Sequence, residues 1–281
     1  MLSRGTANRT IEIERVTVDG RELSNDHVAV EEPLEIQLCT ADASGAAARS
    51  LAVTMRTPGR DPELAVGFLM SESVIERAAD VASVETLGET FDGGQNTVRV
   101  TLADHVDVDW RSLERHFYTT SSCGVCGKAS LDAVAVRSAT PYRGNFHIQL
   151  ASLLALPAAL RERQEVFGLT GGLHAAAAFD RAGRILEISE DVGRHNAVDK
   201  TIGALLQRGE LPATEFGLLV SGRASFELVQ KALMAGMPML VAVGAPSSLA
   251  VDLATRFDMT LVGFLRDRQL NIYCGAFRVE S

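Results

Sequence analysis

The chain has 281 residues, of which 46% are hydrophobic and 22% charged, and this composition excludes a disordered or fibrous protein and leaves room for two domains. Its formal net charge of −9 argues against a broad nucleic-acid-binding surface. The longest uncharged stretch, residues 232–251, is interrupted by glycine and proline, so we expect no membrane span. Residues 1–10 are polar and lack the apolar core of a secretory signal, so we expect a cytoplasmic protein.

Residues 1–117 predict a small α+β N-terminal domain. Asp61-Pro62-Glu63 is typical of a helix start, because it combines a capping carboxylate, a first-turn proline and an acid near the positive end. Alternating apolar residues predict strands before and after this helix, over 11–18, 34–38, 51–55 and 97–102. Strands around one helix indicate a small sheet with the helix packed on one face.

Residues 129–281 predict an α/β domain with a different rhythm. Strands are expected over 184–188, 216–220, 239–243, 261–265 and 270–273, and helices over 194–207, 224–235 and 248–257. Gly209 and Gly236 follow two of these helices, as glycines at helix ends do. Alternation of strands and helices implies a mainly parallel sheet that is covered on both faces.

Residues 118–128, between the two predicted domains, are rich in hydroxyl residues and glycine, and we expect them to form a mobile loop. This segment contains two of the four cysteines, as Cys123-Gly124-Val125-Cys126. A pair at this spacing can cycle between dithiol and disulfide, supply half of a zinc site, or carry a sulfane sulfur as a persulfide.

Spacing alone leaves these chemistries open. Zinc would need two further ligands, and the six histidines are scattered along the chain. A thioredoxin-like pair would be expected at a helix start beside a βαβ pattern, and two buried, unreactive thiols are a further alternative. For the isolated Cys39 and Cys274 we expect only a packing role.

Three strand-to-helix junctions in the second half share a polar character. They cover residues 189–195, 221–225 and 244–248. Ligands of open α/β sheets usually bind at the carboxyl ends of parallel strands, and helix N-termini favour phosphate there. Arg194 and Arg223 would add positive charge beside those amides. The alternative at each junction is ordinary turn and cap chemistry, and His174, which follows Gly171-Gly172, is as readily a core histidine as a ligand-binding one.

Taken together, these segments resemble the formate dehydrogenase accessory sulfurtransferase (FdhD) family. The matching motifs run in order from residue 122 almost to the end of the chain. They are Ser-Cys-Gly-Val-Cys-Gly (122–127), Leu-Thr-Gly-Gly-Leu-His-Ala-Ala-Ala (169–177), Glu-Asp-Val-Gly-Arg-His-Asn-Ala-Val-Asp-Lys (190–200), Ser-Gly-Arg-Ala-Ser-Phe-Glu-Leu-Val-Gln-Lys (221–231) and Leu-Val-Gly-Phe (261–264). Residues 32–34 and 65–69 add to the resemblance in the first half.

The resemblance implies a two-domain homodimer whose larger C-terminal domain has the three-layer, cytidine-deaminase-like fold without deaminase chemistry. It also implies a sulfurtransferase that takes sulfur from a cysteine desulfurase. The sulfur would pass to a molybdenum or tungsten bis-guanine-dinucleotide pterin cofactor, a bound substrate that matures formate dehydrogenase. No intrinsic metal is expected, and the alternative is a non-enzymatic chaperone of the pterin cofactor with guarding cysteines.

Carried over by residue, the resemblance makes Cys123 the persulfide cysteine and Cys126 its partner. It assigns cofactor binding to the segment Phe264, Leu265, Arg266, Asp267, Arg268 and Gln269. Family members often have Gly-Gly where this chain has Asp267-Arg268, which adds a negative charge that Arg266 and Arg268 can offset. With the junction residues, the predicted cofactor site also includes His174, Arg194, His195, Ser221 and Arg223.

Overall fold

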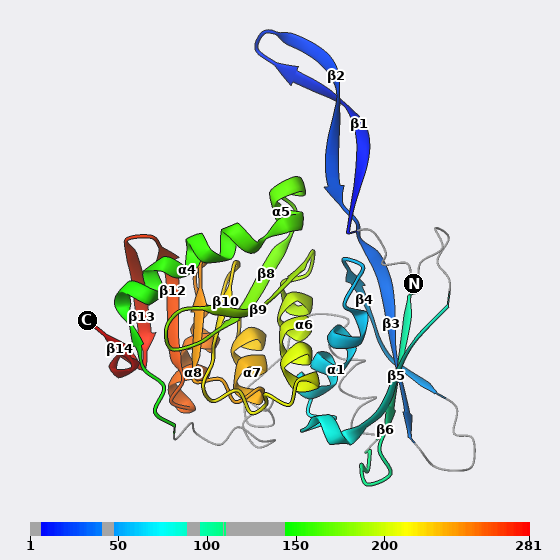
Figure 1. Ribbon diagram of the computed structural model, residues 1–281, viewed down its shortest axis with the longest axis vertical. Coiled ribbons are helices and arrows are strands. Elements are labelled where there is room, and N and C mark those ends of the chain that lie inside the picture. Colours follow the sequence, from blue (N-terminus) through cyan, green and yellow to red (C-terminus); the bar gives the residue numbers. More distant parts are fainter. Residues whose placement is uncertain (1–6, 41–47, 89–95, 109, 111–143) are drawn as a thin grey trace.

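The computed structural model describes residues 7–40, 48–88, 96–108, 110 and 144–281. Two main sheets lie side by side, and a long β-hairpin projects beyond them (Figure 1). The elements in chain order are β1 (Asn8–Thr17), β2 (Gly20–Ala29), β3 (Glu32–Thr40), β4 (Arg49–Arg56), α1 (Asp61–Ser71), the 3₁₀ turn η1 (Ala78–Asp80), β5 (Val81–Leu87), β6 (Thr97–Leu102), β7 (Ile148–Gln149), α4 (Leu150–Arg163), α5 (Glu165–Thr170), β8 (His174–Phe179), β9 (Ile185–Asp191), α6 (Arg194–Gln207), β10 (Gly217–Val220), α7 (Phe226–Met234), β11 (Met239–Ala242), α8 (Ser248–Arg256), β12 (Thr260–Arg266), β13 (Gln269–Cys274), η2 (Ala276–Arg278) and β14 (Val279–Glu280).

The first sheet has the strand order β4-β3-β6-β5, with β3 and β6 parallel and the outer pairs antiparallel. Leu34, Ile36 and Leu38 of β3 alternate inward and are fully buried, which confirms the strand predicted there. Helix α1 covers the inner face and begins at Asp61, as predicted from its acidic, proline-containing first turn.

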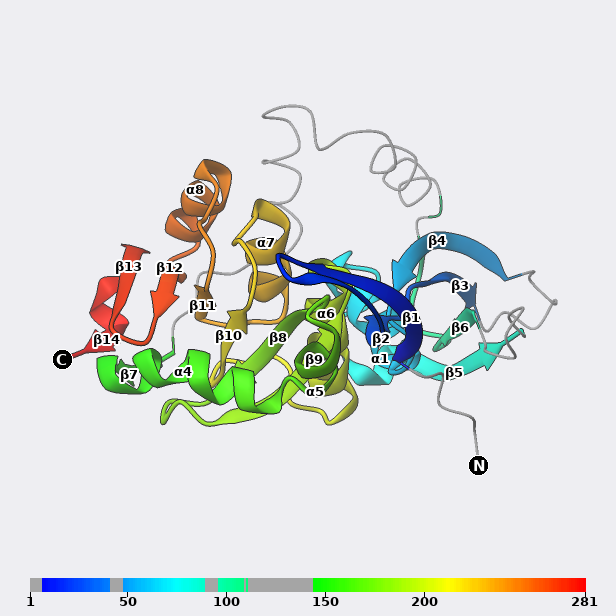
Figure 2. The ribbon, with the colours of Figure 1, turned by 90° about the horizontal axis from the view of Figure 1, so that it is seen from above.

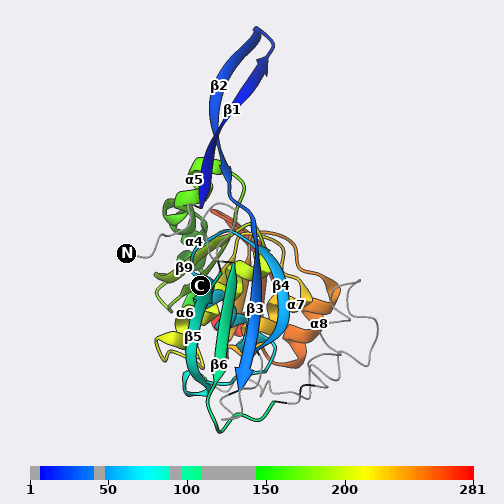
Figure 3. The same cartoon turned by 90° about the vertical axis from the view of Figure 1, so that its right-hand side faces the viewer.

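Strands β1 and β2 form an antiparallel ribbon that pairs over ten residues on each strand. Figures 1 and 3 show this ribbon extending away from both sheets as an arm. The side chains of Val16, Val18 and Leu23 near its tip are 60–102% exposed. The base of the arm packs on α5, where Gly172 approaches Ala29.

Within the described residues, the second sheet has six strands in the order β13-β12-β11-β10-β8-β9. The neighbours β10, β11 and β12 are parallel, whereas β8 and β13 run antiparallel to the strands beside them. The prediction of a mainly parallel sheet is therefore wrong, because hairpins add antiparallel strands. One hairpin joins β8 to β9 through a turn in which Asp180 accepts hydrogen bonds from the backbone N–H groups of Ala182 and Arg184.

Four strands of this sheet end at the same edge. Strand β9 runs antiparallel to β8, which is itself antiparallel to β10, so β9 points the same way as β10, β11 and β12. The carboxyl ends of these four strands therefore meet at one edge. The helices α6, α7 and α8 all begin at that edge.

Helices lie on both faces of the second sheet. Helices α6, α7 and α8 cover one face and α4 the other (Figure 2). Helix α6 has the predicted bounds, and α7 begins two residues later than predicted, at Phe226. Gly209 and Gly236 have φ angles of 72° and 75°, the left-handed backbone expected after a helix end.

Helices α1 and α6 cross with their backbones in contact and join the two sheets. A Cβ on Gly67 would lie 1.8 Å from the Asp199 carbonyl oxygen, and one on Gly203 would lie 1.9 Å from the Glu63 carbonyl oxygen. One buried apolar cluster extends from β3 and β6 through this crossing to β8, β10 and β11. The predicted boundary segment, 118–128, lies outside the described residues. In the part of the chain that is described, no helix combines the length and apolar character needed to cross a membrane.

Candidate functional site

Backbone hydrogen bonds tie together the loops at the carboxyl edge of the second sheet. The N–H of Gly244 donates to the carbonyl of Gly222 at 2.8 Å, and that of Ala224 donates to Ala245 at 3.1 Å. The N–H of Phe264, at the end of β12, donates to Gly244 at 3.0 Å. The loops after β10 and β11 and the end of β12 thus form one continuous backbone surface.

His174, Arg194 and Ser221 meet on this edge. A Cβ placed on Gly222 would lie 3.5 Å from His174 Nδ1 and 3.9 Å from Arg194 Cδ, so these side chains flank that glycine. Ser221 Oγ accepts a 2.9 Å hydrogen bond from the N–H of Ala175, the residue after His174. Burial, with the Arg194 charge, lowers the pKa of His174, while Asp191 opposes the shift. His174 is therefore neutral at physiological pH.

Arg194 carries a polar atom that has no partner in the part of the chain that the structure describes. Its Nε is buried and makes no hydrogen bond to the described residues, and the same holds for His195 Nε2 in the next position. Buried donors are nearly always satisfied in native proteins. Arg194 Nε is a donor, and His195 Nε2 is one in the tautomer that carries its proton there, so the start of α6 holds two buried polar atoms with no partner among the described residues.

His195 and Glu227 stand side by side at the starts of α6 and α7. His195 Nε2 lies 3.9 Å from Glu227 Oε2, close enough for charges to interact but too far for a hydrogen bond. The His195 ring is the largest cause of a low pKa for Glu227, about 2, so the carboxylate is ionised throughout the physiological range. No role is predicted for Glu227 from the sequence, because its pairing with His195 depends on two helices that only the fold brings together.

The segment predicted to bind the cofactor, Phe264 to Gln269, forms the end of β12 and the turn into β13. Phe264 has a φ of 53° and is 39% exposed, so its backbone is held in an unusual conformation at the edge. Leu265 is fully buried in the core under α4, so only its backbone is available to a ligand. Arg266 donates to the carbonyls of Val243 and Leu265, both at 2.7 Å, and the remaining members of the segment, Asp267, Arg268 and Gln269, are exposed.

Several polar residues of the motif over 190–200 are structural. Asp191 is fully buried and accepts bonds from Lys200 Nζ at 2.7 Å, Gly193 N at 2.8 Å and Thr57 N at 3.2 Å. Asn196 donates to Asp191 and to the carbonyl of Met55, on the first sheet. These bonds hold the loop that carries Arg194 against the loop between β4 and α1.

No individual role is predicted for Asp191, Asn196 or Lys200 from the sequence. An Asp and a Lys nine positions apart give no local signal of a pair, because the strand-to-helix turn between them decides whether they meet.

The cysteines at the centre of the sequence interpretation, Cys123 and Cys126, lie outside the described residues. Arg223 is exposed beside the edge. Cys274 is half-buried, its thiol donates to the Met259 carbonyl at 3.1 Å, and burial raises its pKa, all of which suit a packing role. Among the described residues, no three His, Cys, Asp or Glu side chains gather as a metal site requires.

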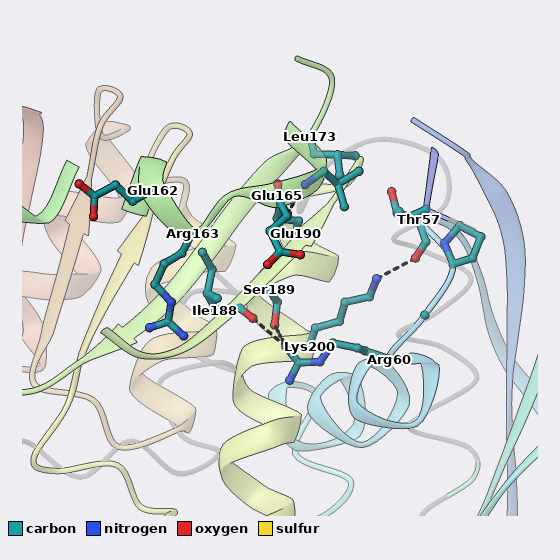
Figure 4. Close-up of a pocket in the computed structure, with 14 residues that line it drawn as sticks. Thr57, Arg60, Glu162, Arg163, Glu165, Leu173, Ile188, Ser189, Glu190 and Lys200 are labelled. Atoms are coloured by element: carbon teal, nitrogen blue, oxygen red, sulfur yellow. Dashed lines mark hydrogen bonds between the residues drawn. The ribbon is translucent and has the colours of Figure 1, made fainter. Parts of the chain in front are cut away.

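A cavity of about 440 Å³ with both charged and apolar lining residues lies next to this edge, between the β4–α1 loop and the α4–α5 corner. Figure 4 shows Arg163 and Glu165 on one side and Thr57 on the other, with Lys200 reaching across to the Thr57 carbonyl. Glu190 accepts bonds from the N–H groups of Val166 and Phe167 and so holds the start of α5. The charges of Lys200 and Arg60 are balanced by Asp191 and Glu187.

The protein thus has an α/β fold, and Arg194 and Arg223 lie where β9, β10, β11 and β12 end, so this edge of the second sheet suits an anion. The model of the FdhD/NarQ family matches residues 29–280, and the chain belongs to this family. It is 53% identical over 259 residues to the "Sulfur carrier protein FdhD" of Streptomyces coelicolor, which covers 90% of this chain and 89% of that protein. It is 49% identical over 286 residues to the protein of that name from Nocardia farcinica, covering 100% of this chain and 97% of that one.

A solved structure supports the fold. The crystal structure of a formate dehydrogenase accessory protein from Desulfotalea psychrophila superimposes with a TM-score of 0.74 at 21% identity, covering 98% of this chain and 100% of that one. The mixed α/β architecture with several sheets is thereby confirmed. The finer prediction of cytidine-deaminase-like layering remains a prediction.

Proposed function

We propose that this protein is a sulfur carrier for the maturation of formate dehydrogenase. The observation that carries the proposal is the match to relatives named sulfur carrier proteins, at up to 53% identity and over nearly the whole chain. The crystal structure with the same fold is described as a formate dehydrogenase accessory protein.

The sulfur is carried by the cysteine pair. The thiolate of Cys123 attacks the sulfane sulfur of a cysteine desulfurase persulfide, the donor S–S bond breaks, and the desulfurase cysteine leaves as a thiolate. Cys123 then holds the sulfur as a persulfide. For release, the thiolate of Cys126 attacks Cys123 Sγ, so the pair becomes a disulfide and the sulfane sulfur leaves reduced, as sulfide, for the metal of the acceptor. A thiol reductant must afterwards restore the pair.

The acceptor is a molybdenum or tungsten bis-guanine-dinucleotide pterin cofactor, bound as substrate at the carboxyl edge. The helix starts, the exposed Arg223 and Arg194 Nε, for which the described residues supply no partner, suit its phosphates. Phe264, the backbone of Leu265, and the exposed Arg266, Asp267, Arg268 and Gln269 border the same edge. His174 and Ser221 line the loop beside Arg194. In this proposal the protein acts in the cytoplasm as a homodimer, with the desulfurase and formate dehydrogenase as partners.

The test is intact-protein mass spectrometry after incubation with a cysteine desulfurase and cysteine. Wild type should gain sulfur, and Cys123→Ala should not. Cys274→Ser is the matched control, since its half-buried thiol has a raised pKa, and it should gain sulfur as wild type does. No gain in wild type would sink the persulfide route and leave the chaperone alternative, in which formate dehydrogenase matures without either cysteine.

A further inference from the structure

Each polar group of Thr57, in the loop between β4 and α1, bonds to the junction between β9 and α6. Its N–H donates to Asp191 Oδ2 at 3.2 Å, and its Oγ1 accepts from the N–H of Val192 at 3.1 Å. Its carbonyl accepts from Lys200 Nζ at 2.8 Å. Thr57 is 2% exposed, so it is not itself open to a ligand. These three bonds hold the chain on both sides of Arg194.

The turn that orients Arg194 depends on these bonds. Helix α6 begins at Arg194 after Gly193, which has an extended backbone (φ −95°, ψ 118°) and no side chain to cap the helix. Within the turn, Asp191 Oδ1 accepts from the N–H of Gly193 at 2.8 Å. The N–H of Val192, between them, is instead held by the hydroxyl of Thr57, across the contact between the two sheets. The direction of the Arg194 side chain therefore depends on the first sheet as well as on the second.

Removal of that hydroxyl would release the turn. Residues 192–195 are partly buried, so when the N–H of Val192 loses its acceptor, the turn can rotate toward solvent and hydrate that amide. Such a rotation would move Arg194, whose buried Nε has no partner among the described residues. Guanidinium–phosphate bonds are directional, so affinity for a phosphate-bearing ligand would fall although every anion-binding group is still present.

We infer that Thr57 is a positioning residue for the carboxyl edge: through its hydroxyl it fixes the turn before Arg194 and so sets the affinity of that edge for a phosphate-bearing ligand. This inference rests on the proposed function, which brings such a ligand to the edge. The two fail separately, because the edge can bind phosphate whether or not Thr57 orients it. In this arrangement the first sheet contributes to ligand binding through a residue that does not touch the ligand.

The experiment is calorimetric titration of the full chain with GDP, a nucleotide fragment of the proposed ligand. Thr57→Val keeps the shape of the side chain and removes its hydroxyl, and it should weaken GDP binding about tenfold. Thr57→Ser keeps the hydroxyl and should bind GDP within about twofold of wild type. In Thr57→Val, the peptide that contains Val192 should also exchange its amide hydrogens faster than in wild type.

Ser71→Ala is the matched control. The hydroxyl of Ser71, in α1, donates to Asp199 Oδ1, in α6, at 2.8 Å, so this bond also joins the two sheets. Ser71 is 1% exposed, and its bond lies away from the turn before Arg194. Ser71→Ala should therefore bind GDP as wild type does, although a thermal melt should show a lower Tm for this variant as well as for Thr57→Val.

Four results would overturn the inference while the proposed function stands. If Thr57→Val binds GDP as tightly as wild type, Thr57 has a structural role alone. If Ser71→Ala weakens binding as much as Thr57→Val, any loosening between the sheets has this effect. If Thr57→Ser binds as weakly as Thr57→Val, the hydroxyl is not the group that matters. If binding weakens while the exchange of the Val192 peptide is unchanged, the effect does not pass through the turn.

A different result would overturn both ideas. If wild type does not bind GDP, the cofactor edge of the proposed function fails and the inference fails with it. Thr57→Ala removes the same hydroxyl, and it takes the place of Thr57→Val if the melt shows that the valine variant does not fold.

Discussion

Gly203→Ala should push apart the two helices that join the sheets. The new Cβ would lie 1.9 Å from the Glu63 carbonyl oxygen, which is 1.1 Å short of the 3.0 Å below which real contacts essentially never fall. Alanine would gain about 1 kcal/mol over glycine in helix propensity. Overpacking of a tight contact costs about 1–3 kcal/mol, and the upper value applies because a backbone carbonyl cannot rotate away.

The expected net loss is about 2 kcal/mol in the free energy of unfolding, or a fall in Tm of about 4–8 °C. Urea denaturation and a thermal melt followed by circular dichroism would measure it. Gly168→Ala is the control, since Gly168 also lies in a helix but has nothing within 4 Å of the position of its Cβ. That variant should be as stable as wild type or up to about 1 kcal/mol more stable. A Gly203→Ala protein that unfolds at or above the wild-type midpoint would refute the close crossing.

Two further predictions concern buried charges. Lys200→Met should lower the free energy of unfolding in urea by about 3–5 kcal/mol, because it leaves the fully buried Asp191 without its cation. Adding Asp191→Asn should recover much of the loss, and an unchanged single variant would argue against the pair. Burial raises the pKa of Asp80, but hydrogen bonds from Glu76, His105 and Arg77 outweigh it and lower the pKa from 3.8 to about 2. The folded state therefore binds fewer protons, so stability on the order of 2 kcal/mol is present above pH 3.8 and lost as the pH falls to about 2. Acid titration of wild type against Asp80→Asn checks this, and equal slopes between those pH values would contradict it.

Short sequence signals, such as capping residues and glycines at helix ends, predicted the helices in which they occur. Helix α1 begins at Asp61 because acid and proline favour a first turn, and α6 ends before Gly209 because glycine accepts a positive φ. No strand is predicted from the sequence over β8, since four successive alanines give neither alternation nor high β-propensity. Missing β8 concealed the hairpin that makes the sheet mixed.

The sequence was sufficient to predict which loops form the site, but not which side chains contact one another there. The rule that ligands bind at the carboxyl ends of parallel strands places the loops of Arg194 and Arg223 at one edge, and the structure has them there. Leu265 belongs to the predicted segment, yet its side chain is part of the core, because the last residues of β12 alternate between exposed Phe264 and Arg266 and buried Leu265. The contact between His195 and Glu227 needs the spacing of α6 and α7, which no short motif encodes.

The arm formed by β1 and β2 should be less stable than the two main sheets. The match to the family begins at residue 29, where the arm ends. A two-stranded ribbon on its own is marginally stable in water. Its amide hydrogens should therefore exchange with solvent long before those of β10 or β11, and a protease should cut its tip more readily than the strands of the two sheets. Removal of the arm should therefore leave the apolar core around the Gly67–Gly203 crossing folded.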